Sequence, residues 1–112
     1  MITNDMLDMV KCFVNELHPL QIYLFGSYAR GDFRKDSDYD FYIIMSKENK
    51  DMRIIDLTRR AYSSISKRRY TRPTDIVVNF EDDFSRDIHD RSFERRVYKE
   101  GVVLYDRNNS DT

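Results

Sequence analysis

Two short motifs place groups suited to phosphate and metal chemistry near each other in the chain. Gly26 and Ser27 end an apolar segment, and Asp38 and Asp40 follow after an interval of ten residues. In an extended strand, residues two apart point to the same face, so these two carboxylates should converge. Two like charges held together require a cation, and oxygen-only ligands suit Mg²⁺. The spacing therefore predicts a Mg²⁺ site beside a phosphate-binding turn.

The Gly26-Ser27 pair has the properties of a phosphate-binding turn. Glycine lets the backbone approach a phosphate closely. Ser27 would begin a short helix, where free N–H groups and the helix dipole favour an anion and the hydroxyl can donate a hydrogen bond. Arg30, one turn later, is within reach of the same phosphates. The alternatives are a simple capping role for Ser27 and a solvated position for Arg30.

A third aspartate completes the candidate site. Asp75 follows Arg72-Pro73-Thr74 and opens an apolar strand of isoleucine and valine. Three carboxylates can hold two metal ions ~3.5–4 Å apart. The alternative is that Asp75 only begins or caps the strand.

The elements that must position these residues alternate between helix and strand. Helical spacing of Met6, Met9, Val10 and Phe13 predicts a first helix, capped by Thr3 or Asn4 and ended by His18-Pro19. The predicted elements are a helix over 4–17, a strand over 21–25, a short helix over 27–33, a strand over 38–45, a helix from 51 or 52 to about 67, a strand over 74–80, helices over 82–89 and 92–100, and an edge strand over 102–105.

This order predicts an α/β (α+β) fold, a small mixed β-sheet flanked by helices. The strand over 38–45 should place Asp38, Asp40, Tyr42 and Ile44 on one face and Tyr39, Phe41, Ile43 and Met45 on the other. We expect one domain over residues 1–106 and a polar C-terminal tail over 107–112.

The composition limits the class of protein. The 112 residues carry a net charge of −1, which argues against a non-specific nucleic-acid binder. A single cysteine, Cys12, fits a reducing compartment, and no apolar run suggests a membrane span or signal peptide. We therefore expect a cytoplasmic protein with no direct nucleic-acid or membrane partner. His18 and His89 have no second ligand at metal spacing. The basic cluster of Lys67, Arg68, Arg69 and Arg72, preceded by Arg59 and Arg60, fits a charged helix end better than a partner surface.

The combined motif resembles a known family. The segment GSYARGDFRKDSDYDF, the aspartate at 75 and the ending YKEGVVLY are similar to the minimal nucleotidyltransferases of the polymerase-beta-like superfamily. The resemblance covers roughly residues 4–106. It implies transfer of a nucleotide from ATP to a hydroxyl, with Asp38 and Asp40 holding two Mg²⁺ ions and Asp75 completing the site for the ion nearest the attacking hydroxyl. Gly26, Ser27 and Arg30 would bind the triphosphate.

The same resemblance implies a biological role. It indicates the antitoxin of a toxin–antitoxin pair, which transfers AMP to a tyrosine of a HEPN-type ribonuclease partner. The RNase signature of such a partner is an arginine four to six residues before a histidine. Neither His18 nor His89 has one, so we expect this chain to be the modifying partner and not the nuclease. Two alternatives remain open: an antitoxin that neutralises its partner by binding alone, and an aminoglycoside-type nucleotidyltransferase completed by a separate helical subunit.

Overall fold

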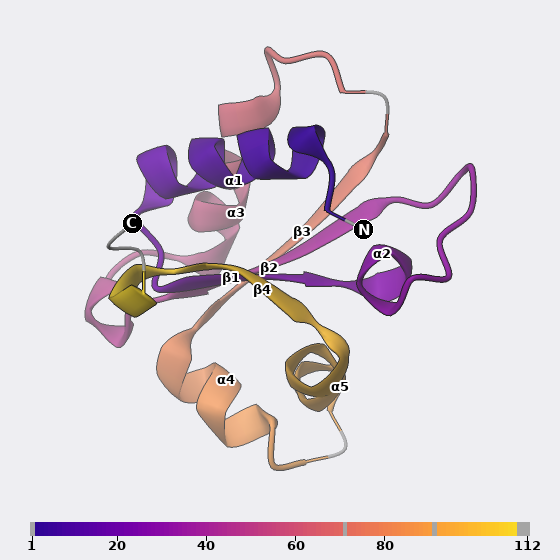
Figure 1. Ribbon diagram of the computed structural model, residues 1–112. Helices are drawn as coiled ribbons and strands as arrows, with labels where there is room; N and C mark the ends of the chain where they lie inside the picture. Colours follow the sequence, from indigo (N-terminus) through magenta and orange to yellow (C-terminus); the bar gives the residue numbers. More distant parts are fainter. Residues whose placement is uncertain (1, 71, 91, 110–112) are drawn as a thin grey trace.

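A computed structural model describes residues 2–70, 72–90 and 92–109, which form a mixed α+β structure around one four-stranded sheet (Figure 1). The elements are α1 (Asn4–Leu17), β1 (Gln21–Phe25), α2 (Gly26–Arg30), β2 (Tyr39–Met45), the 3-10 helix η1 (Lys47–Asn49), α3 (Ile54–Ile65), β3 (Thr74–Phe80), α4 (Glu81–Asp87), α5 (Phe93–Glu100), β4 (Val102–Asp106) and the 3-10 helix η2 (Arg107–Asn109).

The sheet is mixed, as the sequence predicts. Its strand order is β3-β2-β1-β4; β2 and β3 are parallel, and the other neighbours are antiparallel. The C-terminal end of β1 therefore lies beside the N-terminal end of β2, which in turn pairs with the N-terminal end of β3. A loop over 31–38 joins α2 to β2 and extends from this end of the sheet (Figure 1).

Helices cover both faces of the sheet, and β2 separates two cores. Tyr39, Phe41 and Ile43 belong to the larger core, under α1 and α3. Tyr42 and Ile44 belong to the smaller core, under α4 and α5 (Figure 1). The predicted alternation is thus confirmed within β2, although Asp38 precedes the strand. Asp40 lies on the same face of β2 as Tyr42 and Ile44, which is the face that α4 and α5 cover.

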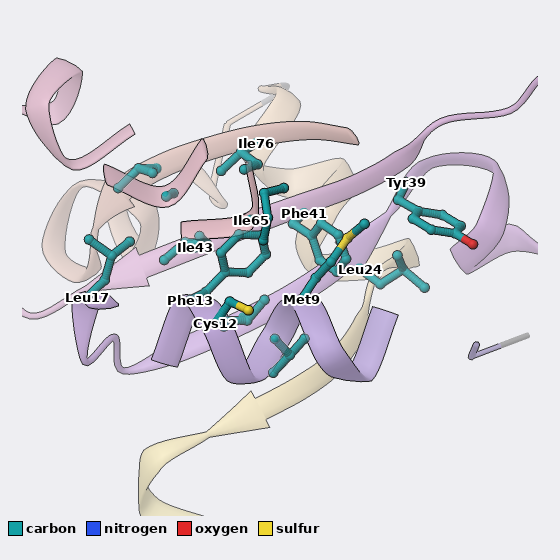
Figure 2. Close-up of a cluster of buried hydrophobic side chains, with 14 of the residues drawn as sticks. Met9, Cys12, Phe13, Leu17, Leu24, Tyr39, Phe41, Ile43, Ile65 and Ile76 are labelled. Atoms are coloured by element: carbon teal, nitrogen blue, oxygen red, sulfur yellow. The ribbon is translucent and has the colours of Figure 1, made fainter. Parts of the chain in front are cut away.

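The larger core fixes the sheet against α1. Phe13 points from α1 to the sheet, and its ring meets that of Phe41 edge-on at 5.3 Å between centroids (Figure 2). Met9 and Cys12 pack in the same cluster, where Cys12 is buried. Full burial of side chains this large is worth about 1.5–3 kcal/mol each, so this core dominates the stability of the domain.

Helix α1 is capped at the predicted residues, Thr3 and His18, and its N-terminal cap is unusual. The Thr3 hydroxyl accepts from the Met6 amide at 3.2 Å, so Thr3 is the N-cap. The Met6 sulfur in turn accepts from the Thr3 amide, completing a capping box in which methionine replaces the usual Glu or Gln. His18, with a left-handed backbone (φ 51°), ends the helix before Pro19.

Several predicted boundaries are wrong by a few residues. The helix expected over 27–33 ends at Arg30, because Gly31 adopts a left-handed conformation that turns the chain. The helix expected from 51 or 52 begins only at Ile54, since η1 and a turn occupy the preceding residues. The helices expected over 82–89 and 92–100 span 81–87 and 93–100, and the Ser92 side chain caps the second.

The basic residues around α3 pair with acidic residues of α1. Arg60 reaches Glu16 at 3.2 Å, and Arg68 reaches Asp8 at 3.1 Å. Both pairs are exposed and link α1 to α3 and to the segment that follows it. No helix in residues 2–70, 72–90 or 92–109 is long and apolar enough to cross a bilayer. The division into a domain over 1–106 and a tail stays a prediction, and residues 110–112 lie outside the described part.

Candidate active site

Strand pairing brings the predicted aspartates to one end of the sheet. Asp40, in β2, is the register partner of Phe25 on one side and of Asp75 on the other. Asp40 alternates with buried Phe41 and shares the face of Tyr42, while Asp75 alternates with buried Ile76. Both carboxylates therefore lie on the α4–α5 face. Asp38 is exposed and immediately precedes β2, which begins at Tyr39 rather than at residue 38 as predicted.

Gly26 forms the wall against which the Asp40 carboxylate packs. Its backbone is left-handed (φ 75°), a conformation that glycine adopts without a steric cost. A Cβ atom built on residue 26 would overlap Oδ2 of Asp40. Glycine is thus required here both by the turn and by the space that the carboxylate occupies. This contact joins the two motifs that the sequence only placed near each other.

The electrostatics of Asp40 show that the carboxylates act on one another. Burial, followed by the charges of Asp75 and Asp38, raises the pKa of the Asp40 carboxyl from 3.8 to about 6, and the Arg30 guanidinium opposes this shift. The raised pKa means that the positive charge near Asp40 is too small to stabilise its ionised carboxylate. Such a site favours a bound cation, because a cation would relieve the repulsion.

The α2 turn leaves polar groups available beside this cluster. Phe25, at the N-cap position, offers no side-chain acceptor to the first amides of α2. The Ser27 carbonyl accepts from Gly31 and Asp32 at the end of the turn, at 2.9 and 3.1 Å. Within the described residues, the Ser27 hydroxyl makes no hydrogen bond. The turn can therefore direct N–H and O–H donors to an anion.

Arg30 lies in the neighbourhood of the site but is engaged by carboxylates. Its guanidinium pairs with Asp32 at 3.2 Å and with Glu100 of α5 at 3.8 Å. A triphosphate would compete with these two partners. Downstream, the Ser37 hydroxyl accepts from the Arg34 amide at 2.7 Å, which orders the turn before Asp38.

The donor set fits a divalent cation in its chemistry, although the side chains are not drawn together around one point. No group of three acidic, histidine or cysteine side chains is arranged to hold a metal ion in the part of the chain that the structure describes. The three aspartates offer only oxygen atoms, which suit Mg²⁺. The assignment of Asp38, Asp40 and Asp75 as metal ligands stays a prediction.

One residue near the site has no sequence signal. Tyr62, in α3, accepts a hydrogen bond from the Ile76 amide at 3.0 Å. Because β3 is an edge strand, this amide has no neighbouring strand on its outer side. The phenol thus secures the backbone next to Asp75. A bond between residues fourteen apart, from a helix to a sheet edge, cannot be read from spacing alone.

Comparisons with known proteins give a family match over most of the chain. The family profile described as "Polymerase beta, Nucleotidyltransferase" matches residues 8–110. A protein of Methanocaldococcus jannaschii, named "Putative protein adenylyltransferase", is 35% identical over 102 residues, which cover 86% of this chain and 94% of that protein.

Two solved structures share the fold. A "putative nucleotidyltransferase" from Sulfolobus solfataricus aligns with a TM-score of 0.64 and 22% identity, over 92% of this chain and 78% of that one. A toxin–antitoxin structure with AMP-PNP aligns with a TM-score of 0.50 and 20% identity, over 89% of this chain and 73% of that one.

The profile match spans nearly the whole chain, and the fold agrees with it. The chain therefore belongs to the polymerase beta nucleotidyltransferase family, and it is a nucleotidyltransferase.

Proposed function

We propose that this chain is a Mg²⁺-dependent protein adenylyltransferase that transfers AMP from ATP to a tyrosine of a HEPN-type ribonuclease and so acts as an antitoxin. The observation that carries the proposal is the contact between Gly26 and Asp40, with Asp75 in register beside it. It brings the turn that we assign to the phosphates next to acidic groups at one end of the sheet.

The proposed reaction is a substitution at the α-phosphorus. The acceptor hydroxyl oxygen forms a bond to that phosphorus, the bond from it to the β-phosphate oxygen breaks, and pyrophosphate leaves. Two Mg²⁺ ions would neutralise the charge that develops on the phosphate oxygens. Asp38 and Asp40 would hold both ions, and Asp75 would hold the ion nearest the hydroxyl and help to accept its proton. Gly26, Ser27 and Arg30 would orient the triphosphate.

The arrangement of the sheet supports separate sides for donor and acceptor. Asp40 lies between Phe25 and Asp75, so the Gly26-Ser27 turn and Asp75 flank it on opposite sides. Phosphates held at the turn would leave the Asp75 side open to the acceptor. The name of the 35% identical relative supports adenylyl transfer to a protein. The HEPN-type partner follows from the resemblance of the motifs.

The test is mass spectrometry of the partner after incubation with this chain, ATP and Mg²⁺. The wild-type chain should add one or more AMP units to a tyrosine. The double variant Asp38→Asn/Asp40→Asn should add none, because the neutral amides cannot hold the cations. Asp36→Asn is the matched control, since Asp36 is exposed in the same loop and should transfer AMP at the wild-type rate.

Other results would contradict the proposal in distinct ways. Undiminished transfer by the double variant would refute the metal site. Neutralisation of the toxin by a transfer-dead variant at the wild-type level would indicate an antitoxin that acts by binding. Radiolabel from ATP on an aminoglycoside hydroxyl, with none on protein, would indicate a small-molecule nucleotidyltransferase.

A further inference from the structure

A cavity of about 170 Å³ lies between α2 and α5, next to the Gly26-Ser27 turn. The two helices contact one another at the same end of the sheet (Figure 1). Gly26 lines the cavity on one side and contacts the Asp40 carboxylate on the other. A ligand in this cavity would therefore adjoin the catalytic carboxylates.

The walls of the cavity are mainly apolar and aromatic. Phe25 and Phe93 contribute rings that meet edge to face, with centroids 5.2 Å apart and planes at 81°. Val97 is buried behind them. Two perpendicular rings provide both a flat face and an edge to a planar ligand, which are the two favoured geometries for aromatic contact.

Charged groups complete the lining. Arg96 belongs to it and forms no ion pair within the described residues. A guanidinium without an ion-pair partner stacks readily on a planar heteroaromatic ring. Arg30, in contrast, is paired with both Asp32 and Glu100. Glu100 also lines the cavity, and Arg30 could turn to a triphosphate only by leaving its two carboxylate partners. The rings of Phe25 and Phe93 and the guanidinium of Arg96 remain for a planar aromatic group.

The position of the cavity indicates whether it would bind the donor or the acceptor substrate. The cavity adjoins the end of β1, while Asp75 lies across β2 from it. In the proposed function, on which this inference rests, the acceptor hydroxyl approaches beside Asp75. The cavity is thus on the donor side. We propose that Phe25, Phe93 and Arg96 form the pocket for the nucleobase of the donor nucleoside triphosphate.

The test compares two ligands on one variant. Phe93→Ala should weaken the binding of ATP with Mg²⁺, measured by isothermal titration calorimetry, by about 5- to 150-fold, the range of base–aromatic stacking. Inorganic tripolyphosphate with Mg²⁺ has no base and should bind the variant as it binds wild type. Phe93 is 41% exposed, so its truncation should leave the fold intact.

Two further measurements separate stacking from general damage. Phe93→Leu retains an apolar side chain without the ring and should also weaken ATP selectively. Tyr98→Ala is the matched control, because Tyr98 lies on the same helix, is 54% exposed and packs against Phe84 instead. It should bind ATP like wild type. In saturation-transfer NMR, the adenine protons of ATP should receive the strongest signal from wild type and lose it in Phe93→Ala.

Unchanged ATP affinity in both Phe93 variants would overturn the proposal, as would equal weakening of ATP and tripolyphosphate. If wild type binds ATP and transfers AMP while these variants do so unchanged, only the pocket assignment fails. If the wild-type chain binds no ATP, both the pocket assignment and the proposed function fail.

Discussion

At the scale of single residues, Gly26 carries two constraints that can be separated by experiment. Its backbone is left-handed, and a Cβ atom would also overlap the Asp40 carboxylate. Gly31 shares the first constraint, with φ 86°, but a Cβ there meets nothing within 4 Å. The pair therefore provides a matched comparison of backbone strain alone and strain combined with a clash inside the site.

We expect Gly31→Ala to lower the free energy of unfolding by about 1–2 kcal/mol, the cost of a left-handed alanine. Gly26→Ala should cost about 1–3 kcal/mol more, because the Asp40 side chain must move to relieve overpacking. It should also abolish AMP transfer, whereas Gly31→Ala should retain it. Urea unfolding and the transfer assay measure both effects. Equal loss of stability and activity in the two variants would show that the contact between residues 26 and 40 is unimportant.

At the scale of elements, a partly buried polar network attaches α5 to the sheet. The Tyr42 hydroxyl donates to Glu94 of α5 at 2.9 Å and accepts from Asn79 of β3 at 3.0 Å. Tyr42 is fully buried, and burial raises the pKa of its phenol well above the usual value. Because α5 supplies Phe93 and Arg96 to the cavity, this network also fixes one wall of the proposed nucleobase pocket.

Tyr42→Phe should lower the free energy of unfolding by about 1–3 kcal/mol, since it leaves a carboxylate and an amide without their partner. Amide hydrogen exchange should accelerate in α5 and remain unchanged in α1, which packs on the other face of the sheet. Tyr98→Phe is the control, because its hydroxyl makes no hydrogen bond within the described residues. Uniform acceleration across both helices would contradict a local role for the network.

Local signals in the sequence predict the bounds of several elements. The bounds of α1, β1 and β3 follow from local signals: helical spacing, His18-Pro19, and apolar runs between turn residues. The early end of α2 depends on the conformation of Gly31, which spacing does not reveal. The Gly26–Asp40 contact depends on strand register, and Phe25 meets Phe93 only through tertiary packing. Local pattern therefore predicts the elements and the aspartates, but not the contacts that connect them.

At the scale of the whole molecule, the raised pKa of Asp40 makes folding depend on pH. The pKa of Asp40 is raised to about 6 in the folded state, so between about pH 4 and 6 the folded chain binds more protons than the unfolded chain. The contribution of this residue to stability therefore falls as pH rises through that window and stays low above it. A carboxylate that destabilises the fold at neutral pH is consistent with a residue kept for chemistry.

Asp40→Asn should consequently stabilise the domain relative to wild type at pH 7.5, without divalent cations, by about 1 kcal/mol, a value reduced because the group is half-exposed and solvent screens the repulsion. At pH 4 the difference should shrink, since wild-type Asp40 is then largely protonated in the fold. Mg²⁺ at pH 7.5 should stabilise wild type more than the variant, because bound cations neutralise the carboxylates. Urea unfolding at both pH values, with and without Mg²⁺, measures all three effects. Asp51→Asn is the control, an exposed aspartate beyond the opposite end of β2. A pH-independent difference between wild type and Asp40→Asn, or equal stabilisation of both by Mg²⁺, would remove the electrostatic basis for a cation at this end of the sheet.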